Sequence, residues 1–311
     1  MKSRIRIFIT LVVLGLLLTA CGAPATPEAP ADQLAEILAR GTIRMATDVA
    51  YPPQSQLVEN PVRPADTRCG PEEHTAAEMA GFDIDVNVEL ARRLGVEPCF
   101  VTPDWEVVIG GNWADRFDIA IESMTITEPR MEVLWFAQPY KSQPEGFFVH
   151  EDSTIAEPSE LSGMTVGVCS GTTYESYLQH TLVMPGVQLD FLVENPQIVG
   201  YDTDSTALQD LALGDGVRLD GVMTEIPLGQ HMISTGSPLR QLDGVIYYEY
   251  SAPAIDKAHG VDPIPFVLRV TEIIQAMHAD GTMARLAAQY YDFDATSGAA
   301  EYDWEALHQF E

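Results

Sequence analysis

The segment 122–130, with the sequence ESMTITEPR, combines hydroxyl side chains with a single arginine. Ser123 and Thr125 precede Arg130 within this hydroxyl-rich turn. A planar guanidinium group donates two parallel hydrogen bonds to a carboxylate, and a nearby threonine adds a hydroxyl group and an N–H. Arg130 and Thr125 are therefore predicted to form half of a carboxylate site. A surface ion pair of Arg130 with Glu128 or Glu132 is the alternative interpretation.

The segment SGTT, at residues 170–173, is predicted to supply the other half of this site. Thr172 and Thr173 follow a glycine turn and precede a helical pattern. The first turn of a helix exposes backbone N–H groups that bind anions. Both threonines also suit a plain helix cap, and this role is compatible with binding.

Alternating strands and helices are predicted to position these segments. Strand patterns cover 42–47, 98–103, 117–124, 165–170 and 219–225, and helical spacing covers 81–95, 174–180, 266–281 and 282–291. A long polar stretch at 54–80 indicates an insertion. This alternation predicts an α/β architecture with sheets covered on both faces. In such folds ligands lie at the carboxyl ends of strands, where Tyr51, the Arg130 loop, the Gly171 turn and Glu225 all fall.

The composition is that of a globular chain with strong negative charge. The 311 residues include 46% hydrophobic and 20% charged residues, and the net charge is −29. Removing residues 1–20 would take away Lys2, Arg4 and Arg6 and no acidic residue, so the net charge would become −32. Such a chain repels nucleic acid and anionic lipid. Solubility explains the acidity better than a partner does.

The N-terminus has the pattern of an export signal. Basic residues precede an apolar run, Ile7–Leu18, that is too short to span a bilayer. The following Leu18-Thr19-Ala20-Cys21 resembles the lipobox of bacterial lipoproteins, which implies cleavage after residue 20 and a lipid on Cys21. An ordinary signal with a chance cysteine is the alternative. Residues 22–32 are rich in Pro and Ala and are predicted to form a tether between the membrane and the fold.

Three cysteines remain for the folded part of the chain. Cys69 and Cys99 flank one predicted helix, and export permits a disulfide, so we expect these two to be bonded. Cys169 would then be a free, buried thiol. No cysteine pair has the spacing of metal ligands and the histidines are scattered, so neither a metal nor another cofactor is predicted.

Five segments in one order resemble the family 3 solute-binding proteins of amino-acid ABC transporters. They are GFDIDVNVELARRLGV, DWEVVI, RFDIAIESMTITEPRMEVLWFAQPY, MTVGVCSGTTYESYL and HADGTMARLAAQYY, and the resemblance runs from Leu34 to Tyr291. The resemblance implies a monomer that binds one free amino acid and delivers it to an ABC permease and its ATPase. With the lipobox, it implies a protein of the cell envelope, lipid-anchored to the membrane.

The same resemblance implies a two-lobed α/β fold, of the type II periplasmic-binding-protein kind, with the ligand in a cleft between the lobes. Lobe 1 would comprise residues 33–143 plus 248–311, and lobe 2 residues 144–247. The chain would cross between the lobes near 140–146 and return near 244–250.

The resemblance also implies roles for further residues. Glu225 stands where the family has an aspartate for the ligand ammonium, and the backbone carbonyl of Ser123 would share this group. Tyr51 and Trp105 match the aromatic walls of the pocket, although Trp105 also suits an ordinary core position. Asp48 and Glu122 would face the ligand side chain, which favours a cationic or polar amino acid.

Two other functions fit parts of the pattern. Cyclohexadienyl dehydratases share the fold and a similar arginine loop, and Glu225 would then be a general acid acting on prephenate or arogenate. The SGTT segment resembles the binding proteins instead, and no nucleophile elbow, P-loop or HExxH motif is present. A receptor sensor lobe is disfavoured because no second apolar span or signalling domain follows in the sequence.

Overall fold

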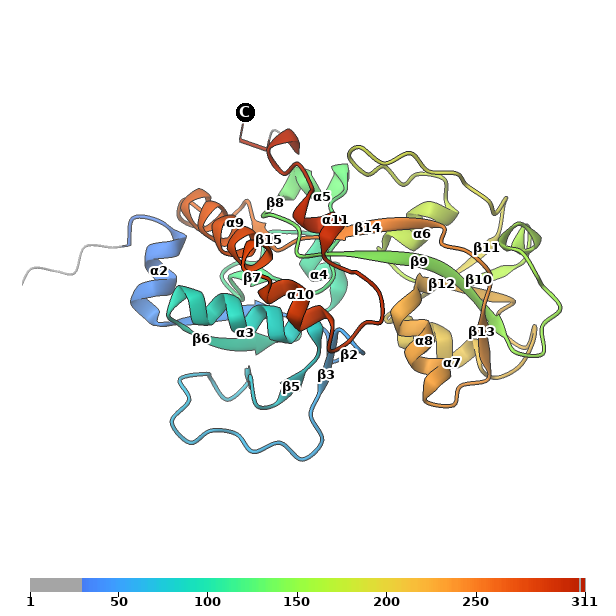
Figure 1. Cartoon of the computed structure of the whole chain (residues 1–311), viewed down its shortest axis with the longest axis horizontal. Helices are drawn as coiled ribbons and strands as arrows, with labels where there is room; N and C mark the ends of the chain where they lie inside the picture. Colours follow the sequence, from blue (N-terminus) through green and yellow to red (C-terminus); the bar gives the residue numbers. More distant parts are fainter. Residues whose placement is uncertain (1–29, 308, 311) are drawn as a thin grey trace, which may run out of the picture. The chain divides into compact units, whose positions relative to one another are not determined.

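The computed structural model describes residues 30–307, 309 and 310, and the chain from Asp32 onward forms one compact unit. The predicted signal, Cys21 and nearly all of the tether lie outside the described residues. Two lobes, each with its own sheet, are visible in Figure 1. No helix among the described residues is both long enough and apolar enough to cross a bilayer.

The first lobe is built on a six-stranded sheet in the order β4-β6-β1-β7-β15-β8. Its strands are β1 (Thr42–Ala46), β4 (His74–Thr75), β6 (Glu97–Val101), β7 (Ile119–Ala120), β8 (Leu134–Phe136) and β15 (Ala254–Asp256). Its helices are α2 (Gln33–Arg40), α3 (Phe82–Leu94), α4 (Trp105–Ile109), α5 (Glu128–Val133), α9 (Ile264–Ala279), α10 (Thr282–Ala287) and α11 (Ser297–Ala300), with a short 3-10 turn η2 (Glu305–Leu307). A small sheet of β2 (Ala50–Tyr51), β3 (Ser55–Leu57) and β5 (Met79–Ala80) adjoins it.

The second lobe is built on the sheet β11-β10-β12-β9-β13, to which β14 adds by pairing with β9. Its strands are β9 (Lys141–His150), β10 (Thr165–Cys169), β11 (Gln197–Tyr201), β12 (Gly221–Glu225), β13 (Leu239–Gln241) and β14 (Tyr247–Ser251). Its helices are α6 (Thr173–Leu178), α7 (Asp204–Leu211) and α8 (Ile226–Ser234), with a 3-10 turn η1 (Pro158–Leu161). Strands β9 and β14 run antiparallel from one lobe to the other (Figure 1).

The helical predictions are confirmed where an apolar stripe meets a clear end signal. In α9, Phe266, Val270, Ile274 and Met277 are all fully buried in the core of the first lobe. Helix α3 ends at Gly95, whose φ of 79° is left-handed, as glycine allows without strain. The pattern at 282–291 is helical only as far as Ala287, where α10 ends.

The third predicted strand, 117–124, is longer than the strand that the structure contains. Only Ile119–Ala120 pair as β7, because the backbone turns at Ser123, whose φ of 59° lies in the left-handed region. The apolar run continues as buried loop, with Ile121 and Met124 in the core. The turn therefore ends the strand early and carries the 122–130 segment out of the sheet.

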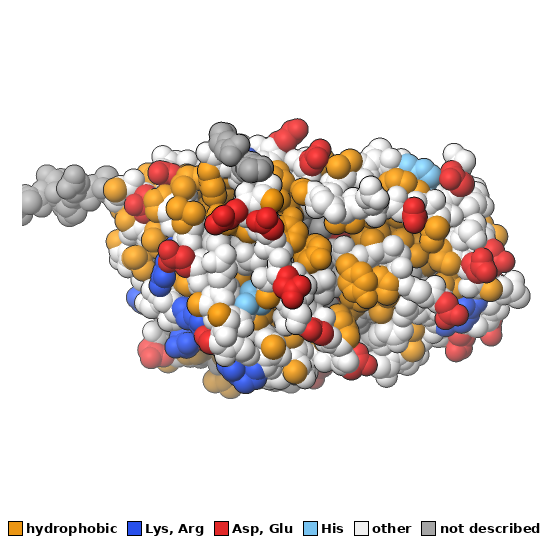
Figure 2. Space-filling view, turned by 45° about the horizontal axis from the view of Figure 1, so that its top comes forward, with side chains coloured by type: hydrophobic (Ala, Val, Ile, Leu, Met, Phe, Trp, Pro, Cys, Tyr) orange, Lys and Arg blue, Asp and Glu red, His pale blue; other side chains and the backbone are white. Residues whose placement is uncertain are grey.

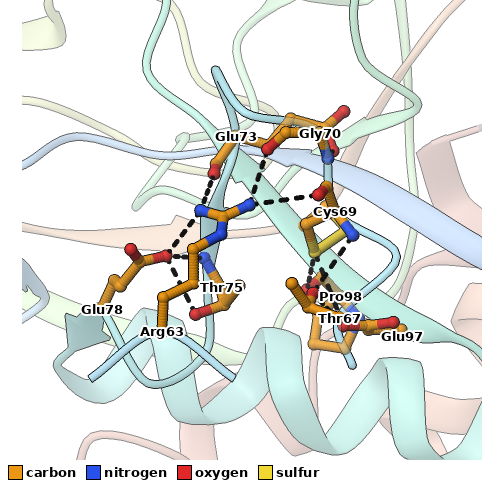
Figure 3. Close-up of polar contacts among 10 residues, drawn as sticks. Arg63, Thr67, Cys69, Gly70, Glu73, Thr75, Glu78, Glu97 and Pro98 are labelled. Carbon is orange, nitrogen blue, oxygen red and sulfur yellow. Dashed lines mark hydrogen bonds and ion pairs between the residues drawn. A yellow bond between two sulfur atoms is a disulfide. The ribbon is translucent and has the colours of Figure 1, made fainter. Parts of the chain in front are cut away.

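The 54–80 stretch is an ordered insertion that includes β3, β4 and β5. Arg63 organises its loop, since Nη1 donates to the Glu73 carbonyl at 2.7 Å and to Glu78 Oε2 at 3.0 Å (Figure 3). Nη2 donates to the carbonyls of Cys69 and Gly70 at 3.1 and 2.7 Å. The hydrogen bonds of this one guanidinium group thus hold the loop in place where it has no regular secondary structure.

The predicted disulfide between Cys69 and Cys99 is confirmed, and Cys169 is free and buried, as expected. The bond ties the insertion to strand β6, beside the hydrogen bond that Thr67 donates to the Glu97 carboxylate (Figure 3). The Arg68 N–H donates to the same carboxylate at 3.0 Å.

Removing this bond by Cys69→Ala and Cys99→Ala is expected to lower the free energy of unfolding by about 3–4 kcal/mol, because the bond closes a loop with a sequence separation of 30 residues. Urea unfolding of the double variant measures this. Cys169→Ala is the control, and an unfolding curve of the double variant that matches the wild type would contradict the expectation.

Candidate functional site

A cavity of about 440 Å³ lies between the two lobes. The first lobe lines it from the turns that follow β1, β6 and β7, and the second from the turns that follow β10 and β11. Both sheets therefore present the carboxyl ends of parallel strands to the same space, where ligands of α/β folds bind. The volume lies in the range of small-molecule sites.

Arg130 lies in the wall of this cavity and is buried. It belongs to α5, which begins after the N-cap Thr127. Its Nη1 donates to the Thr125 carbonyl at 2.9 Å, and its Nη2 reaches the second lobe and donates to the Gly171 carbonyl at 3.2 Å. No acidic side chain among the described residues forms an ion pair with it, so the surface-pair interpretation is wrong.

The two predicted aromatic residues also line the cavity and contact the second lobe. The Trp105 ring lies 5.0 Å beneath the Arg130 guanidinium, and its Nε1 donates to the Gly171 carbonyl at 3.3 Å. The hydroxyl groups of Tyr51 and Tyr174 are 3.5 Å apart. Gly171 must be glycine here, because a Cβ would lie 2.8 Å from Ile109 and its φ is 71°.

The hydroxyl groups near Arg130 are oriented by the chain itself. Thr172 is the N-cap of the six-residue helix α6, and its Oγ1 donates to the Cys169 carbonyl at 2.6 Å. The Thr125 Oγ1 donates to the Glu249 carboxylate. Thr125, Thr172 and Thr173 all line the cavity beside Arg130.

Ser123 lies at the left-handed turn and lines the cavity. Its N–H donates to the Tyr140 hydroxyl and its Oγ to Asp83 Oδ2, both at 2.8 Å. These two bonds fix the turn that places the following residues of the loop.

Acidic side chains dominate the cavity wall. Those that line it are Asp48, Asp104, Glu106, Glu122, Asp202, Asp204 and Glu249, and Arg130 is the one basic residue among the described lining residues. Burial raises the pKa of Glu122 well above its usual value, and the charges of Asp48 and Asp83 raise it further. Burial also raises the pKa of Asp48. A cation bound against this wall would favour the ionised forms of these carboxyl groups and would be attracted to them.

Five of these carboxyl groups were not predicted from the sequence: Asp104, Glu106, Asp202, Asp204 and Glu249. Asp204 opens α7 after β11 and accepts a hydrogen bond of 2.8 Å from Thr224 Oγ1, and burial raises its pKa to about 7. Glu249 lies on β14, within the predicted returning segment 244–250. Burial raises its pKa, and the hydroxyl groups of Thr125 and Thr173 oppose this shift. Position at a strand end was the available signal for Asp204.

Glu225 is not among the residues that line the cavity. It ends β12 with no exposed surface, and its Oε2 lies 3.9 Å from Lys141 Nζ. Lys141 Nζ is also 3.6 Å from Asp83 Oδ1 and 5.9 Å from the ring centres of Phe82 and Tyr291. Burial raises the pKa of Glu225 to about 8, although Lys141 works against this shift. Its role as ammonium partner stays a prediction.

These raised pKa values give an expected pH dependence of stability. In the folded chain the pKa of Asp204 is raised from its ordinary value of 3.8 to about 7, and the pKa of Glu225 from 4.5 to about 8. Between pH 5.5 and 8 the folded state therefore binds more protons than the unfolded state, and the free energy of unfolding falls as the pH rises. Each group contributes up to about 1.4 kcal/mol per pH unit. His278, whose pKa burial lowers, opposes this trend.

Urea unfolding of the ligand-free protein at several pH values across this range tests the expectation. Glu225→Gln should flatten the decline, because it removes one of the buried carboxyl groups that take up a proton in this range. A stability that rises from pH 5.5 to 8 would contradict the titration of these buried carboxyl groups.

Comparison with known proteins gives concordant matches. A sequence model of the bacterial extracellular solute-binding proteins, family 3, matches residues 70–293. The chain is 23% identical over 288 residues to the L-cystine-binding protein of Escherichia coli, covering 91% of this chain and 96% of that one. It is 24% identical over 254 residues to the lysine/arginine/ornithine-binding periplasmic protein of Escherichia coli, covering 81% and 88%.

Among solved structures, the chain is similar to an ancestral amino acid-binding protein that is described as a precursor of cyclohexadienyl dehydratase. The TM-score is 0.66 at 26% identity, and the match covers 83% of this chain and 99% of that one.

Proposed function

Because the chain belongs to the family 3 bacterial extracellular solute-binding proteins, we propose that it captures a free amino acid between its lobes and delivers it to an ABC permease and its ATPase. The cavity between the strand ends of both lobes supports this proposal. A ligand bridging the two walls would hold the lobes together, with β9 and β14 as the connecting strands.

The carboxylate of the ligand is assigned to Arg130, with Thr125, Thr172 and Thr173 as further donors. Thr125 and Thr172 would donate through their backbone N–H groups, because their hydroxyl groups already donate to Glu249 and to the Cys169 carbonyl. Arg130 is buried, and its two terminal nitrogens lie against carbonyl oxygens of opposite lobes. A carboxylate between the lobes would offer this guanidinium group a charged acceptor, and charge-assisted hydrogen bonds are about twice as strong as neutral ones. Tyr51 and Trp105 would enclose the aliphatic part of the ligand.

The side chain of the ligand is proposed to be cationic. The observation that carries this is the excess of carboxyl groups in the wall, with Arg130 as the one described basic lining residue. Asp48 and Glu122 would face the distal cationic group, as the sequence predicts. The relative that binds lysine, arginine and ornithine agrees with this class of ligand.

A thermal-shift comparison tests the proposal. L-Arginine, L-lysine and L-histidine are expected to raise the melting temperature of the purified protein, and L-glutamate to leave it unchanged. A ligand at a hundred times its dissociation constant stabilises the folded state by about 2.7 kcal/mol. Stabilisation by L-glutamate alone would contradict the cationic assignment, and no response to any amino acid would contradict amino-acid capture.

A dehydratase activity is the second candidate, because Glu225 is a buried carboxyl group with a raised pKa of about 8, which suits a general acid. Two observations weigh against it. Glu225 does not line the cavity, and the acidic wall would repel the anion prephenate. We therefore propose binding without turnover, and incubation with prephenate or arogenate is expected to yield no product.

The remaining proposals concern the arrangement of the whole chain. Residues 1–20 would be the signal and Cys21 the lipidated residue, with 22–32 as the tether of a monomer anchored to the membrane in the cell envelope, in the periplasm or at the outer face of the cytoplasmic membrane. Lobe 1 would comprise 33–143 plus 248–311, and lobe 2 would comprise 144–247. Strands β9 and β14, which lie at both proposed boundaries, support this division.

A further inference from the structure

One face of the strands that connect the lobes, together with the end of β12, carries a cluster of buried charged side chains. In the register of β9 and β14, Gln143 lies opposite Glu249 and Glu145 opposite Tyr247. Glu145 also lies opposite Glu225 of β12. Side chains directly opposite in an antiparallel pair project to the same face, as do those two residues apart. The face therefore gathers Lys141, Glu145, Glu225 and Glu249, each 2% exposed or less.

Lys141 is the positively charged neighbour of Glu225 on this face. Its ammonium group lies 3.6 Å from Asp83 and 3.9 Å from Glu225, and its side chain is 1% exposed. Glu225 thus has an ammonium group of the chain itself as its neighbour. A second ammonium group, from a ligand, would have to approach the charge of Lys141, which is unfavourable in a buried site.

Glu249 differs from Glu225 in two respects: it lines the cavity, and its Oε2 accepts a hydrogen bond from Thr125. Its buried Oε1, like both carboxylate oxygens of Glu225, has no hydrogen-bond partner among the described residues. An unpartnered carboxylate oxygen in a cavity wall is costly unless a ligand supplies a donor.

Thr125 also sets the position of Glu249 relative to the carboxylate site. Its carbonyl accepts from Arg130 Nη1 at 2.9 Å, and its hydroxyl group donates to Glu249. Thr125 therefore lies between the Arg130 guanidinium donor and the Glu249 carboxylate acceptor and sets the distance between them. The carboxylate and ammonium groups of an α-amino acid are joined through a single carbon atom and need a donor and an acceptor at such close spacing.

We infer that Glu249, and not Glu225, receives the α-ammonium group of the ligand, while Lys141 occupies the place beside Glu225. The inference rests on the proposed amino-acid binding and identifies a binding residue within it. Glu122 is the competing carboxyl group, because it is buried in the same wall and its Oε1 also lacks a partner among the described residues. Within the part of the chain that the structure describes, Glu122 forms no side-chain hydrogen bond comparable to the bond between Thr125 and Glu249.

Calorimetry with two probes tests the inference. L-Arginine is compared with 5-guanidinopentanoate, which keeps the guanidinium group, the methylene chain and the carboxylate and lacks the α-ammonium group. The wild type is expected to prefer L-arginine by tenfold or more. Glu249→Gln, which keeps the shape and removes the charge, should bring this preference close to one, whereas Glu225→Gln and Glu122→Gln should keep it.

A preference that persists in Glu249→Gln and collapses in Glu225→Gln or Glu122→Gln overturns the inference and leaves the proposed function standing. A wild type that binds neither probe overturns both. Melting temperatures without ligand establish that each variant folds. If Glu249→Gln does not fold, Glu249→Asp replaces it, since its withdrawn carboxylate should lower the preference, and an unchanged preference would again overturn the inference.

Discussion

Replacing Arg130 by alanine is expected to weaken the binding of L-arginine by a factor of tens or more. The guanidinium group is buried in the cavity wall, and its loss would leave the ligand carboxylate without its charged partner. The cost of leaving one partner of a buried charge pair unmatched is about 2–5 kcal/mol. Calorimetric titration of the variant with L-arginine measures this loss.

Two controls make the result specific. Arg218→Ala removes an arginine that pairs with Asp210 on the surface of the second lobe, so it should bind like the wild type. Agmatine is L-arginine without the carboxylate, and its affinity should be nearly the same in the wild type and in Arg130→Ala. Native affinity of Arg130→Ala for L-arginine would show that the cavity holds the carboxylate by other groups.

Lys141→Met is expected to lower the free energy of unfolding by about 3–5 kcal/mol, because breaking a buried pair leaves uncompensated charge behind. Lys141 is the ammonium group nearest to Asp83 and Glu225, and both carboxyl groups have no exposed surface. These carboxyl groups take up protons more readily at low pH, so the loss should grow as the pH rises. Urea unfolding at pH 6 and pH 8 measures both effects.

Lys257→Met is the matched control for Lys141→Met. Lys257 donates to the Met131 carbonyl and lies over the Trp135 ring, and it forms no ion pair among the described residues. Its replacement should cost much less. The double variant Lys141→Met/Glu225→Gln should recover part of the loss, and strict additivity of the two changes would contradict a direct interaction between these side chains.

The sequence was sufficient for features that depend on short spacing. The ends of α3 at Gly81 and Gly95, the buried stripe of α9 and the bond between Cys69 and Cys99 follow from local patterns and were predicted. A Cβ at Gly81 would lie 2.1 Å from the Gln54 carbonyl, so the close approach of the chain at the two ends of the insertion requires glycine at this position.

The distribution of charge in the site depends on contacts that no local pattern contains. Lys141 and Glu225 are far apart in sequence and become neighbours through the pairing of β9 with β12. Glu249 reaches Thr125 because the backbone at Thr125 bridges directly to Ser251 at the end of β14. A sequence comparison position by position therefore assigns the ammonium group to Glu225 and passes over Glu249.

The distribution of charge over the surface agrees with the composition. Figure 2 shows acidic side chains spread over both lobes on one face, with Lys and Arg side chains gathered mostly on the first lobe. At a net charge of −29 the chain attracts cations from a distance, and this steering weakens as the salt concentration rises. Inside the cavity, the acidic wall also favours a cationic ligand, at short range.

Calorimetric titration of the purified protein with L-arginine, with agmatine as the comparison, tests the central claim most directly. A cavity that clamps a zwitterionic head group and attracts a cationic side chain predicts saturable binding of one L-arginine per chain and much weaker binding of agmatine. The absence of saturable heat with L-arginine, or equal affinity for agmatine, would contradict the account.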